Sequence, residues 1–282
     1  MTVHKSIITV LAAVLVVASG CQQPTLQPKQ LCPGKPTVQQ AAAMIELQKQ
    51  NVQPMMASAD CIMSWRDEKG NEKDEQVSGK MAFVPPGKIF FKGDKFGEIR
   101  FGTNETEFWL RVKPELDSYW WGRKAQAAYC DETLLLNPAQ IAEALGIVNV
   151  TTDWELFYRD GYDVLSLYEA GKLKKRVSVN ACDYYIEEIE YFDVQEIKKV
   201  SVKLTNYWAG DDGLTVPSTI FVSYFDALGL EESSVQIKLK HVRPLPPQKQ
   251  KKRLFERPGR DGYEHVYYLN DKCEFIEGES NE

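Results

Sequence analysis

The chain has 282 residues, of which 43% are hydrophobic and 26% are charged, and its formal net charge is −6. This composition is that of a globular protein with a core, and it excludes global disorder. An acidic chain of this kind has no electrostatic footprint for nucleic acid, so we expect no nucleic-acid partner.

The N-terminus has the pattern of an export signal. Lys5 is followed by an apolar run from Ile7 to Ala18. This run is shorter than the roughly 20 apolar residues of a membrane-spanning helix. Its length is typical of the hydrophobic part of a secretory signal. We therefore expect residues 1–20 to be a signal peptide.

The signal ends in a motif that identifies its type. Ala18-Ser-Gly-Cys21 resembles the lipobox of bacterial lipoproteins, in which the cysteine is diacylated and becomes the first residue after cleavage. The alternative is an ordinary signal peptide that is cut near Ala18 or Gly20. We favour the lipobox, with Cys21 as the site of lipid attachment and acylated Cys21 as the contact with the membrane.

Residues 21–36 have the composition of a flexible spacer behind that anchor. They contain Pro24, Pro28, Pro33, Gly34 and Pro36 among Gln and Lys, which is typical of a disordered or polyproline-type tether. In well-studied bacterial lipoproteins, Gln rather than Asp directly after the cysteine indicates the outer membrane. We expect a lipid-anchored protein of the bacterial cell envelope, on the outer membrane and facing the periplasm.

An odd number of cysteines, five, follows Cys21 in the sequence. The five are Cys32, Cys61, Cys130, Cys182 and Cys273. An exported chain permits disulfides, and an odd count leaves at least one thiol unpaired or bonded to another chain. We expect one or two structural disulfides, with the pairing open, and favour this over a redox function. Without a C-x-x-C or His/Cys cluster, we expect no metal and no cofactor.

The first expected elements are one helix and a meander of strands. The helix runs from Val38 to about Val52, with Thr37 as its cap. A period-two pattern then predicts strands at Ala57–Arg66, Ser78–Val84, Lys88–Lys92, Glu98–Phe101, Glu105–Val112 and Ser118–Gly122. Because large apolar residues alternate with charged ones, we expect antiparallel strands with one buried face.

A second helix interrupts the meander at Asn137–Gly146, with Asn as cap, Pro in the first turn and Gly at the end. Strands resume at Tyr162–Tyr168, Lys174–Ala181, Tyr184–Asp193, Glu196–Tyr207, Thr215–Phe225, Ser233–Val242 and His265–Leu269. A single sheet of about twelve or thirteen strands should curl. The fold class we predict is mainly β (α+β): an incomplete, strongly curled antiparallel β-barrel with both helices on the concave face.

A basic segment with several prolines, Arg243 to Arg253, separates the last two expected strands. It could serve as a peptide ligand or contact anionic lipid headgroups. We favour a solvated connector, because its prolines exclude it from a central strand.

The sequence contains no catalytic motif in its proper context. Four acids cluster at Glu187, Glu188, Glu190 and Asp193. A carboxylate pair can hydrolyse a glycosidic bond, but acids that alternate with Ile and Tyr usually form the solvent face of a strand. Likewise Trp109, Trp120 and Trp121 could stack on a sugar, although packing is the commoner use of Trp. We expect no enzymatic activity.

The order of signal, lipobox, spacer, helix, curled meander with a central helix, and final strand resembles a known family. It is similar to the LolA/LolB-type fold of periplasmic lipoprotein carriers and outer-membrane lipoprotein acceptors. Local phrases add to the likeness, namely Gly79–Gly93, Phe108-Trp-Leu110 and Phe255–Gly262. The likeness covers residues 37–272, which we expect to form the half-barrel domain, and leaves 273–282 as a polar C-terminal tail.

In that family an incomplete barrel is capped by helices, and the space between them holds acyl chains. The resemblance implies a non-catalytic protein that binds a lipid or lipoprotein acyl chain. The residues expected to line its cavity are Met81, Phe83, Ile89, Phe91, Ile99, Phe101, Phe108, Leu110, Tyr119, Trp121, Ile141, Leu145, Val202 and Leu204. The alternative is an envelope interaction or assembly lipoprotein, with a closed cavity, no lipid ligand and an unspecified protein partner. An envelope hydrolase ranks third.

Overall fold

The computed structural model describes residues 31–66, 69–94, 98–113, 117–128, 130, 137–210 and 213–278. The chain divides into two units, Met1–Leu31 and Cys32–Glu282, and all elements below belong to the second. The expected signal peptide and Cys21 lie outside the described residues. Within the described part of the chain, no helix has the length and apolar character needed to cross a membrane.

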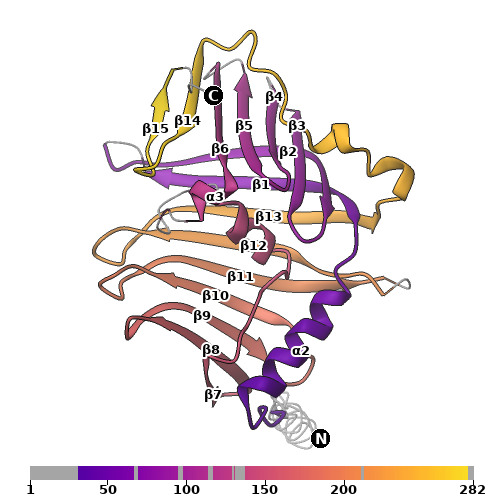
Figure 1. Cartoon of the computed structure of the whole chain (residues 1–282), viewed down its shortest axis with the longest axis vertical. Coiled ribbons are helices and arrows are strands. Elements are labelled where there is room, and N and C mark those ends of the chain that lie inside the picture. The colour runs from indigo at the N-terminus through magenta and orange to yellow at the C-terminus, as the bar shows by residue number, and fades with distance from the viewer. Residues whose placement is uncertain are drawn as a thin grey trace, which may run out of the picture. The chain divides into compact units, whose positions relative to one another are not determined.

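The described elements are mostly strands (Figure 1). In chain order they are α2 (Val38–Gln50), β1 (Met55–Arg66), β2 (Glu72–Val84), β3 (Lys88–Asp94), β4 (Glu98–Thr103), β5 (Glu107–Lys113), β6 (Ser118–Arg123), α3 (Lys124–Ala127), α4 (Pro138–Glu143), β7 (Glu155–Arg159), β8 (Tyr162–Glu169), β9 (Lys172–Asn180), β10 (Ile186–Phe192), β11 (Lys198–Ala209), β12 (Thr215–Phe225), β13 (Glu231–Pro244), the 3-10 turns η1 (Pro247–Lys249) and η2 (Lys252–Phe255), β14 (His265–Leu269) and β15 (Phe275–Glu277).

These strands form one curled, unclosed sheet in the order β15-β14-β6-β5-β4-β3-β2-β1-β13-β12-β11-β10-β9-β8-β7. Neighbouring strands are antiparallel, with the exception of β14, which pairs in parallel with β6. β1 pairs with β13, so the first and the last long strand of the chain lie side by side at the middle of the sheet. The curled antiparallel sheet that the sequence predicts is confirmed.

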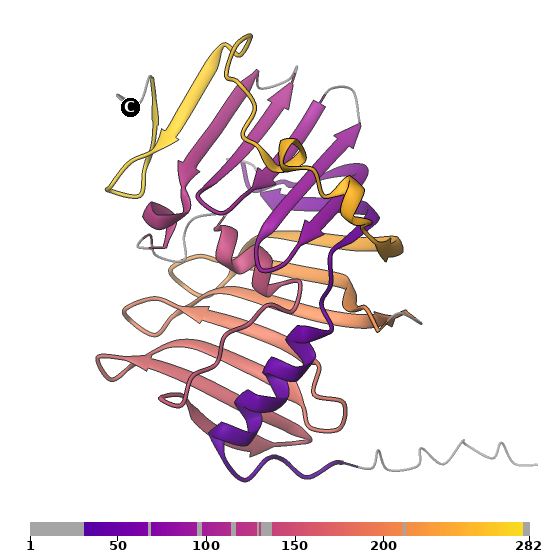
Figure 2. The ribbon, with the colours of Figure 1, turned by 45° about the vertical axis from the view of Figure 1, so that its right-hand side comes forward.

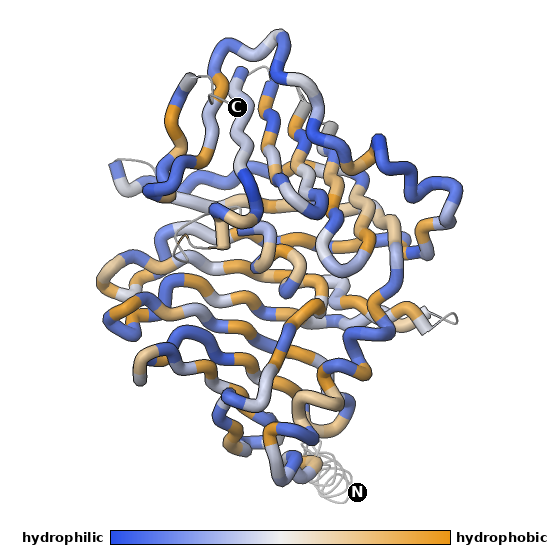
Figure 3. Tube along the Cα trace, viewed as in Figure 1, coloured by the Kyte–Doolittle hydropathy of each residue, from blue (hydrophilic) through white to orange (hydrophobic). Residues whose placement is uncertain are grey.

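Helices α2 and α4 lie on one face of the sheet, which we call the inner face (Figures 1 and 2). Hydrophobic and hydrophilic residues alternate along the strands in Figure 3, and the apolar phase of β8–β13 points to this face. It forms the main core together with Ala41 and Ile45 of α2, which are 0% and 2% exposed. Both helices therefore cover the inner face, as expected.

Local chemistry sets the ends of both helices. The Thr37 side chain accepts a hydrogen bond from the Gln40 N–H and starts α2 at Val38. At α4 the Asn137 side chain accepts from the Ala139 N–H, and Pro138 occupies the first turn. The helix ends at Glu143, earlier than expected, and Gly146 follows in the left-handed region with φ of +93°.

Two short strands were not predicted. β7 lies at one edge of the sheet, and Leu156 is the one half-buried residue among its five. Its sequence therefore shows no alternation of buried and exposed positions. β15 has three residues and pairs with β14 at the opposite edge. Strands this short and exposed depend on their neighbour for their structure.

The folded unit extends beyond the expected residues 37–272 at both ends. A disulfide joins Cys32 to Cys182, in the turn before β10, so part of the expected spacer is fastened to the sheet. A second disulfide joins Cys130 to Cys273 beside β15, within the expected polar tail. Cys61 is a free thiol. Two structural disulfides and one free thiol match the expectation from the cysteine count.

The segment between β13 and β14 crosses the opposite face of the sheet, which we call the outer face (Figure 2). Leu245 and Phe255 pack there on Ala82 of β2. Farther along, Tyr263 packs on a second outer cluster formed by Trp109, Tyr119 and Trp121. Strands β1–β6 are therefore buried partly from the outside, whereas β8–β12 are covered from the inside by α2.

Candidate functional site

An apolar recess lies on the inner face beneath α4. It has a volume of about 70 Å³ and is partly open. Its lining comes from α4 and the segment after it together with strands β2, β11, β12 and β13: Met81, Asn137, Gln140, Ile141, Ala144, Leu145, Val202, Ile220, Val222, Tyr224 and Ile237. Its polar groups are the amides of Asn137 and Gln140, at the cap and in the first turns of α4, and the hydroxyl of Tyr224.

The surroundings of the recess are poor in water. Burial raises the pKa of Tyr224, which lines it, to about 12. Burial also raises the pKa of the Cys61 thiol to about 11, with a smaller contribution from the neighbouring Asp60 carboxylate. Cys61 pairs in register with Ile237, one of the lining residues. The recess is therefore suited to an apolar ligand.

Half-exposed apolar side chains continue from the recess across the inner face. Met81 of β2, Phe91 of β3 and Leu110 of β5 are partly buried and pack against the main core, and β4, between β3 and β5, contributes the buried Phe101. In the register of the sheet, Met81 lies opposite Phe91, and Phe91 opposite Phe101. Among the described residues, α2 lies over β8–β12, and α4 lies over the recess that Met81 lines. Phe91 and Leu110 therefore extend the apolar surface of the recess along the inner face.

The structure divides the fourteen residues that the sequence assigned to a cavity. Met81, Ile141, Leu145 and Val202 line the recess. Phe91, Ile99 and Leu110 are half-exposed and on the inner-face phase of their strands. A third group, Phe83, Ile89, Phe101 and Leu204, is buried in the main core at 0–8% exposure. None of these four is among the residues that line the recess.

Three assigned residues lie away from the recess. Phe108 packs with Ala127 and Leu269 in a separate cluster. Tyr119 and Trp121 are on the outer face, because the register pairs Leu110 of the inner face with Trp120. In the run Tyr119-Trp-Trp121 the side chains that point to either face are aromatic. Alternation therefore could not show which of them point to the inner face. Trp120 instead stacks on Tyr267 at 5.5 Å between ring centroids.

Sequence reasoning missed Ile220, Val222, Tyr224 and Ile237, although β12 and β13 were both predicted. The information that would have identified them is the pairing of β11 with β12, which places Val222 opposite Val202 and Ile220 opposite Leu204. Once Val202 is assigned to the inner face, antiparallel register assigns its partners as well. Register was the missing information.

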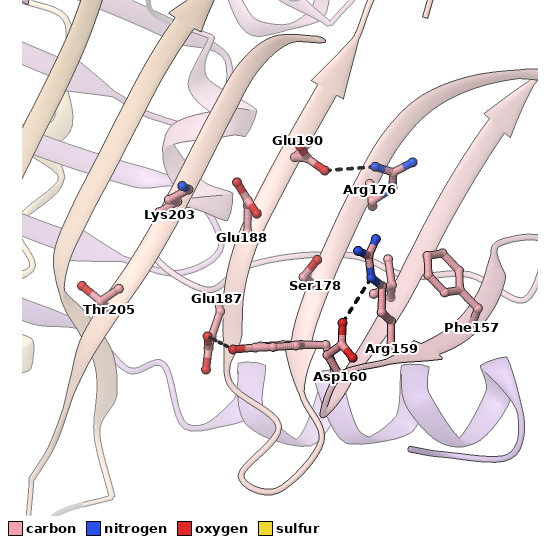
Figure 4. A pocket seen from close by; sticks show the side chains of 12 residues that line it. Phe157, Arg159, Asp160, Arg176, Ser178, Glu187, Glu188, Glu190, Lys203 and Thr205 are labelled. Atoms are coloured by element: carbon pink, nitrogen blue, oxygen red, sulfur yellow. Dashed lines mark hydrogen bonds and ion pairs between the residues drawn. The ribbon is translucent and has the colours of Figure 1, made fainter. Parts of the chain in front are cut away.

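A second recess of about 540 Å³ lies on the outer face of β7–β11 and contains the acidic cluster (Figure 4). Glu190 forms ion pairs with Arg176 and Lys198, each at 3.3 Å. Glu188 accepts a hydrogen bond from the Ser201 hydroxyl, and Glu187 accepts one from the Tyr162 hydroxyl. Each of these carboxylates therefore has a structural partner on a strand surface.

The fourth acid of that cluster, Asp193, belongs to a turn. Although burial alone would raise its pKa, hydrogen bonds from the Ile197 and Gln195 N–H groups and the charge of Lys199 hold the pKa of Asp193 below its usual value. The four acids thus have the roles expected of a solvent face and its turn. Across the described residues, no three His, Cys, Asp or Glu side chains are grouped to hold a metal ion.

Comparison with proteins of known structure identifies the type of fold. No family model matches the sequence, and no curated protein matches it significantly. A LolA superfamily protein from Nitrosomonas europaea superposes with a TM-score of 0.50 at 10% identity, over 77% of this chain and 97% of its own. Two further structures score slightly lower. A protein described as an outer-membrane lipoprotein-sorting domain, from Vibrio parahaemolyticus, gives 0.49 at 10% identity over 78% and 100%.

A DUF1329 family protein from Desulfovibrio piger gives a TM-score of 0.48 at 12% identity over 78% of this chain and 99% of its own. At these identities the likeness concerns the fold alone. The fold of this chain is LolA-like, with one large curled, unclosed sheet and a few helices. The fold resemblance inferred from the sequence is confirmed.

Proposed function

We propose that this protein is a lipid-anchored lipoprotein of the bacterial cell envelope that binds a lipid or lipoprotein acyl chain on the inner face of its sheet, without catalysis. The observation that carries the proposal is the apolar recess beneath α4, continued by the half-exposed strip of Met81, Phe91 and Leu110. The LolA-like fold agrees with it. A LolA superfamily protein from Nitrosomonas europaea shares this fold.

The size of the recess defines how an acyl chain would lie. A volume of about 70 Å³ is room for roughly five waters, so a whole acyl chain does not fit beneath α4. The chain end would occupy the recess, and the remaining methylenes would cover the strip on β2–β5. Each methylene removed from water contributes about 0.8 kcal/mol, so a long partial contact suffices for binding.

The competing function is that of an interaction or assembly lipoprotein with no lipid ligand. The tight packing of α2 on the sheet, with Ala41 and Ile45 almost fully buried, agrees with a filled half-barrel of that kind. The two proposals differ in one respect that can be measured. Only the acyl-binding protein has affinity for a free fatty acid at the recess.

The test is binding of a fluorescent fatty acid to the delipidated mature chain, with mass spectrometry of the lipids extracted from it. Filling the recess by Ala144→Phe should weaken binding at least tenfold, and Ile237→Glu should do the same by placing a charge in it. Matched controls are Ala139→Phe on the exposed side of α4 and Gln236→Glu on the opposite face of β13, which should bind as the wild type does.

Melting curves establish that each variant is folded. If no lipid copurifies and the wild type does not bind the probe, the acyl-binding function is wrong and the assembly function is preferred. The anchor is tested separately by Cys21→Ser, which should release the protein from isolated membranes. Retention of that variant in a high-salt membrane wash would contradict lipid attachment.

A further inference from the structure

The segment from Arg243 to Phe255, which we call the basic loop, is held firmly against the body of the protein. Leu245 and Phe255 are 4% and 3% exposed and fasten its two ends to the outer face of β2. The Leu245 N–H donates to the Pro54 carbonyl at 2.8 Å, and the Asn104 side chain donates to the Phe255 carbonyl at 3.2 Å. Between these ends the loop forms the turns η1 and η2.

The basic loop carries a concentration of one sign of charge. Five of its side chains are exposed cations: Arg243, Lys249, Lys251, Lys252 and Arg253. No Asp or Glu occurs between residues 233 and 255, although the whole chain has a net charge of −6. None of the five forms an ion pair with another described residue. Figure 3 shows the loop mostly in the hydrophilic colour where it projects from the sheet.

A solvated connector, which we expected here, explains the prolines and the exposure but not this charge. Five like charges on thirteen residues repel one another within a Debye length of about 10 Å. A solvated connector needs only polar residues, and nothing requires its charged residues to have the same sign. Because the ends are fastened and η1 and η2 shape the loop, the cations are presented on a fixed support, which reduces the entropy lost when they contact a partner.

We propose that the basic loop docks on the anionic phospholipid headgroups of a membrane. The five cations line none of the recesses described above, so they are arranged for an extended anionic surface and not for a single enclosed anion. Three of them are lysines, whose compact ammonium groups suit dispersed phosphates without demanding a bidentate geometry. Clusters of four to eight Lys or Arg are the usual signature of such surfaces.

The position of the loop is compatible with the proposed anchor. At most about 36–40 Å of chain joins Cys21 to Cys32, over eleven residues. One end of the loop is hydrogen-bonded to Pro54, four residues after the C-terminal end of α2, and the thirteen residues of α2 span about 20 Å. A protein anchored at Cys21 can therefore lay this side on the same membrane. This compatibility rests on the proposed function, but the docking itself does not.

The experiment uses the mature chain, residues 21–282, with Cys21→Ser, secreted from a cleavable signal so that no acyl anchor contributes. Binding to vesicles is measured by flotation. The chain should bind phosphatidylglycerol vesicles, should not bind phosphatidylcholine vesicles, and should dissociate as NaCl rises from about 0.05 to about 0.5 M, because salt screens exposed charges.

The loop variant replaces Lys249, Lys251, Lys252 and Arg253 with Gln. Each cation near an anionic surface changes the partition coefficient about fivefold, so binding should fall at least tenfold and at most several hundredfold. The matched control removes four exposed cations elsewhere, by Arg66→Gln, Arg159→Gln, Lys203→Gln and Lys272→Gln. It has the same net charge as the loop variant and should retain most of the binding.

Four results would overturn the proposal. The first is that the wild-type chain fails to bind phosphatidylglycerol vesicles, and the second is that the loop variant binds as tightly as the wild type. The third is that the control loses as much binding as the loop variant, since net charge and not the loop would then determine binding. The fourth is equal binding to phosphatidylcholine. A failure of fatty-acid binding at the recess would leave these outcomes unaffected.

Discussion

Asp163 is a fully buried carboxylate to which the N-terminal segment of the folded unit is fastened. It is 0% exposed and accepts hydrogen bonds from the Lys35 N–H at 2.9 Å and the Tyr184 hydroxyl at 2.7 Å. Burial and the hydrogen bond to Asp163 raise the pKa of Tyr184, so the phenol remains a donor. Gly34 lies so close that an added Cβ would be 2.3 Å from the Asp163 carboxylate. Only glycine permits this approach of the backbone.

We predict that Asp163→Ala lowers the free energy of unfolding by about 2–4 kcal/mol, because it leaves two buried donors without an acceptor. Tyr184→Phe should cost about 1 kcal/mol, since it removes one hydrogen bond and leaves the carboxylate with the Lys35 N–H. Urea unfolding followed by tryptophan fluorescence measures both. An Asp163→Ala variant within about 0.5 kcal/mol of the wild type, the range of ordinary surface changes, would contradict this role.

Helix α4 is attached to the sheet by charge as well as by apolar packing. Its last residue, Glu143, forms an ion pair with Lys175 of β9 and accepts a hydrogen bond from the Tyr191 hydroxyl of β10. The side chains of Glu143 and Lys175 are only 16% and 12% exposed. With six residues, α4 is too short to be stable by itself. Its position over the recess therefore depends on these contacts.

We predict that Glu143→Gln loosens α4 and lowers the free energy of unfolding by about 1–3 kcal/mol, because it leaves the Lys175 ammonium largely buried without its counter-charge. Hydrogen exchange at the amides of Ile141 and Ala144 should become faster, while exchange in α2 stays unchanged. The double variant Glu143→Met with Lys175→Met removes both charges and should recover much of the loss. Wild-type exchange rates in Glu143→Gln would show that packing alone holds the helix.

At the scale of the whole molecule, two long-range disulfides tie the ends of the folded unit to its body. Cys32–Cys182 and Cys130–Cys273 close loops of 150 and 143 residues. Bridges over loops of this length stabilise chiefly by restricting the unfolded chain, by up to about 5 kcal/mol each. They lie in different parts of the fold, but their loops share residues 130–182, so their effects are coupled through the unfolded chain.

We predict that Cys32→Ser with Cys182→Ser, and Cys130→Ser with Cys273→Ser, each lower the free energy of unfolding by about 2–5 kcal/mol. In the oxidised Cys21→Ser chain, an alkylating reagent should label one thiol, Cys61, and only slowly before unfolding, because a pKa of about 11 leaves little thiolate. Unfolding curves and mass spectrometry measure these outcomes. Two or more labelled thiols in the denatured, oxidised chain would contradict the pairing.

The elements were largely predictable, because local patterns determine them. Thr37 and Asn137 cap the two helices where expected, and the alternation in β11 and β13 locates those strands and their inner faces. Prediction failed where local signals were weak or ambiguous. β7 has almost no buried phase, β15 is three residues long, and Tyr119-Trp-Trp121 is apolar on both sides.

The candidate site was only partly predictable for a related reason. Alternation gives the phase of one strand, but a recess is made by several strands and a helix together. Met81 and Val202 line the recess, whereas Phe83 and Leu204, which share their phase, do not. Whether a residue on the inner face is covered depends on the position of α2 and α4 above it, which no strand pattern contains.

By itself, then, the sequence determined the curled antiparallel sheet, the helices α2 and α4, the odd cysteine and the solvent face at Glu187–Glu190, because each follows from periodicity, capping or counting over a short stretch. Tertiary structure alone decided the pairing of the cysteines, the face of Trp121, the fastening of the basic loop and the recess beneath α4. These features include contacts between residues that lie 150 or more positions apart, such as Cys32 with Cys182 and Pro54 with Leu245. Contacts over such separations arise from register and packing, and they leave no periodic trace along the chain.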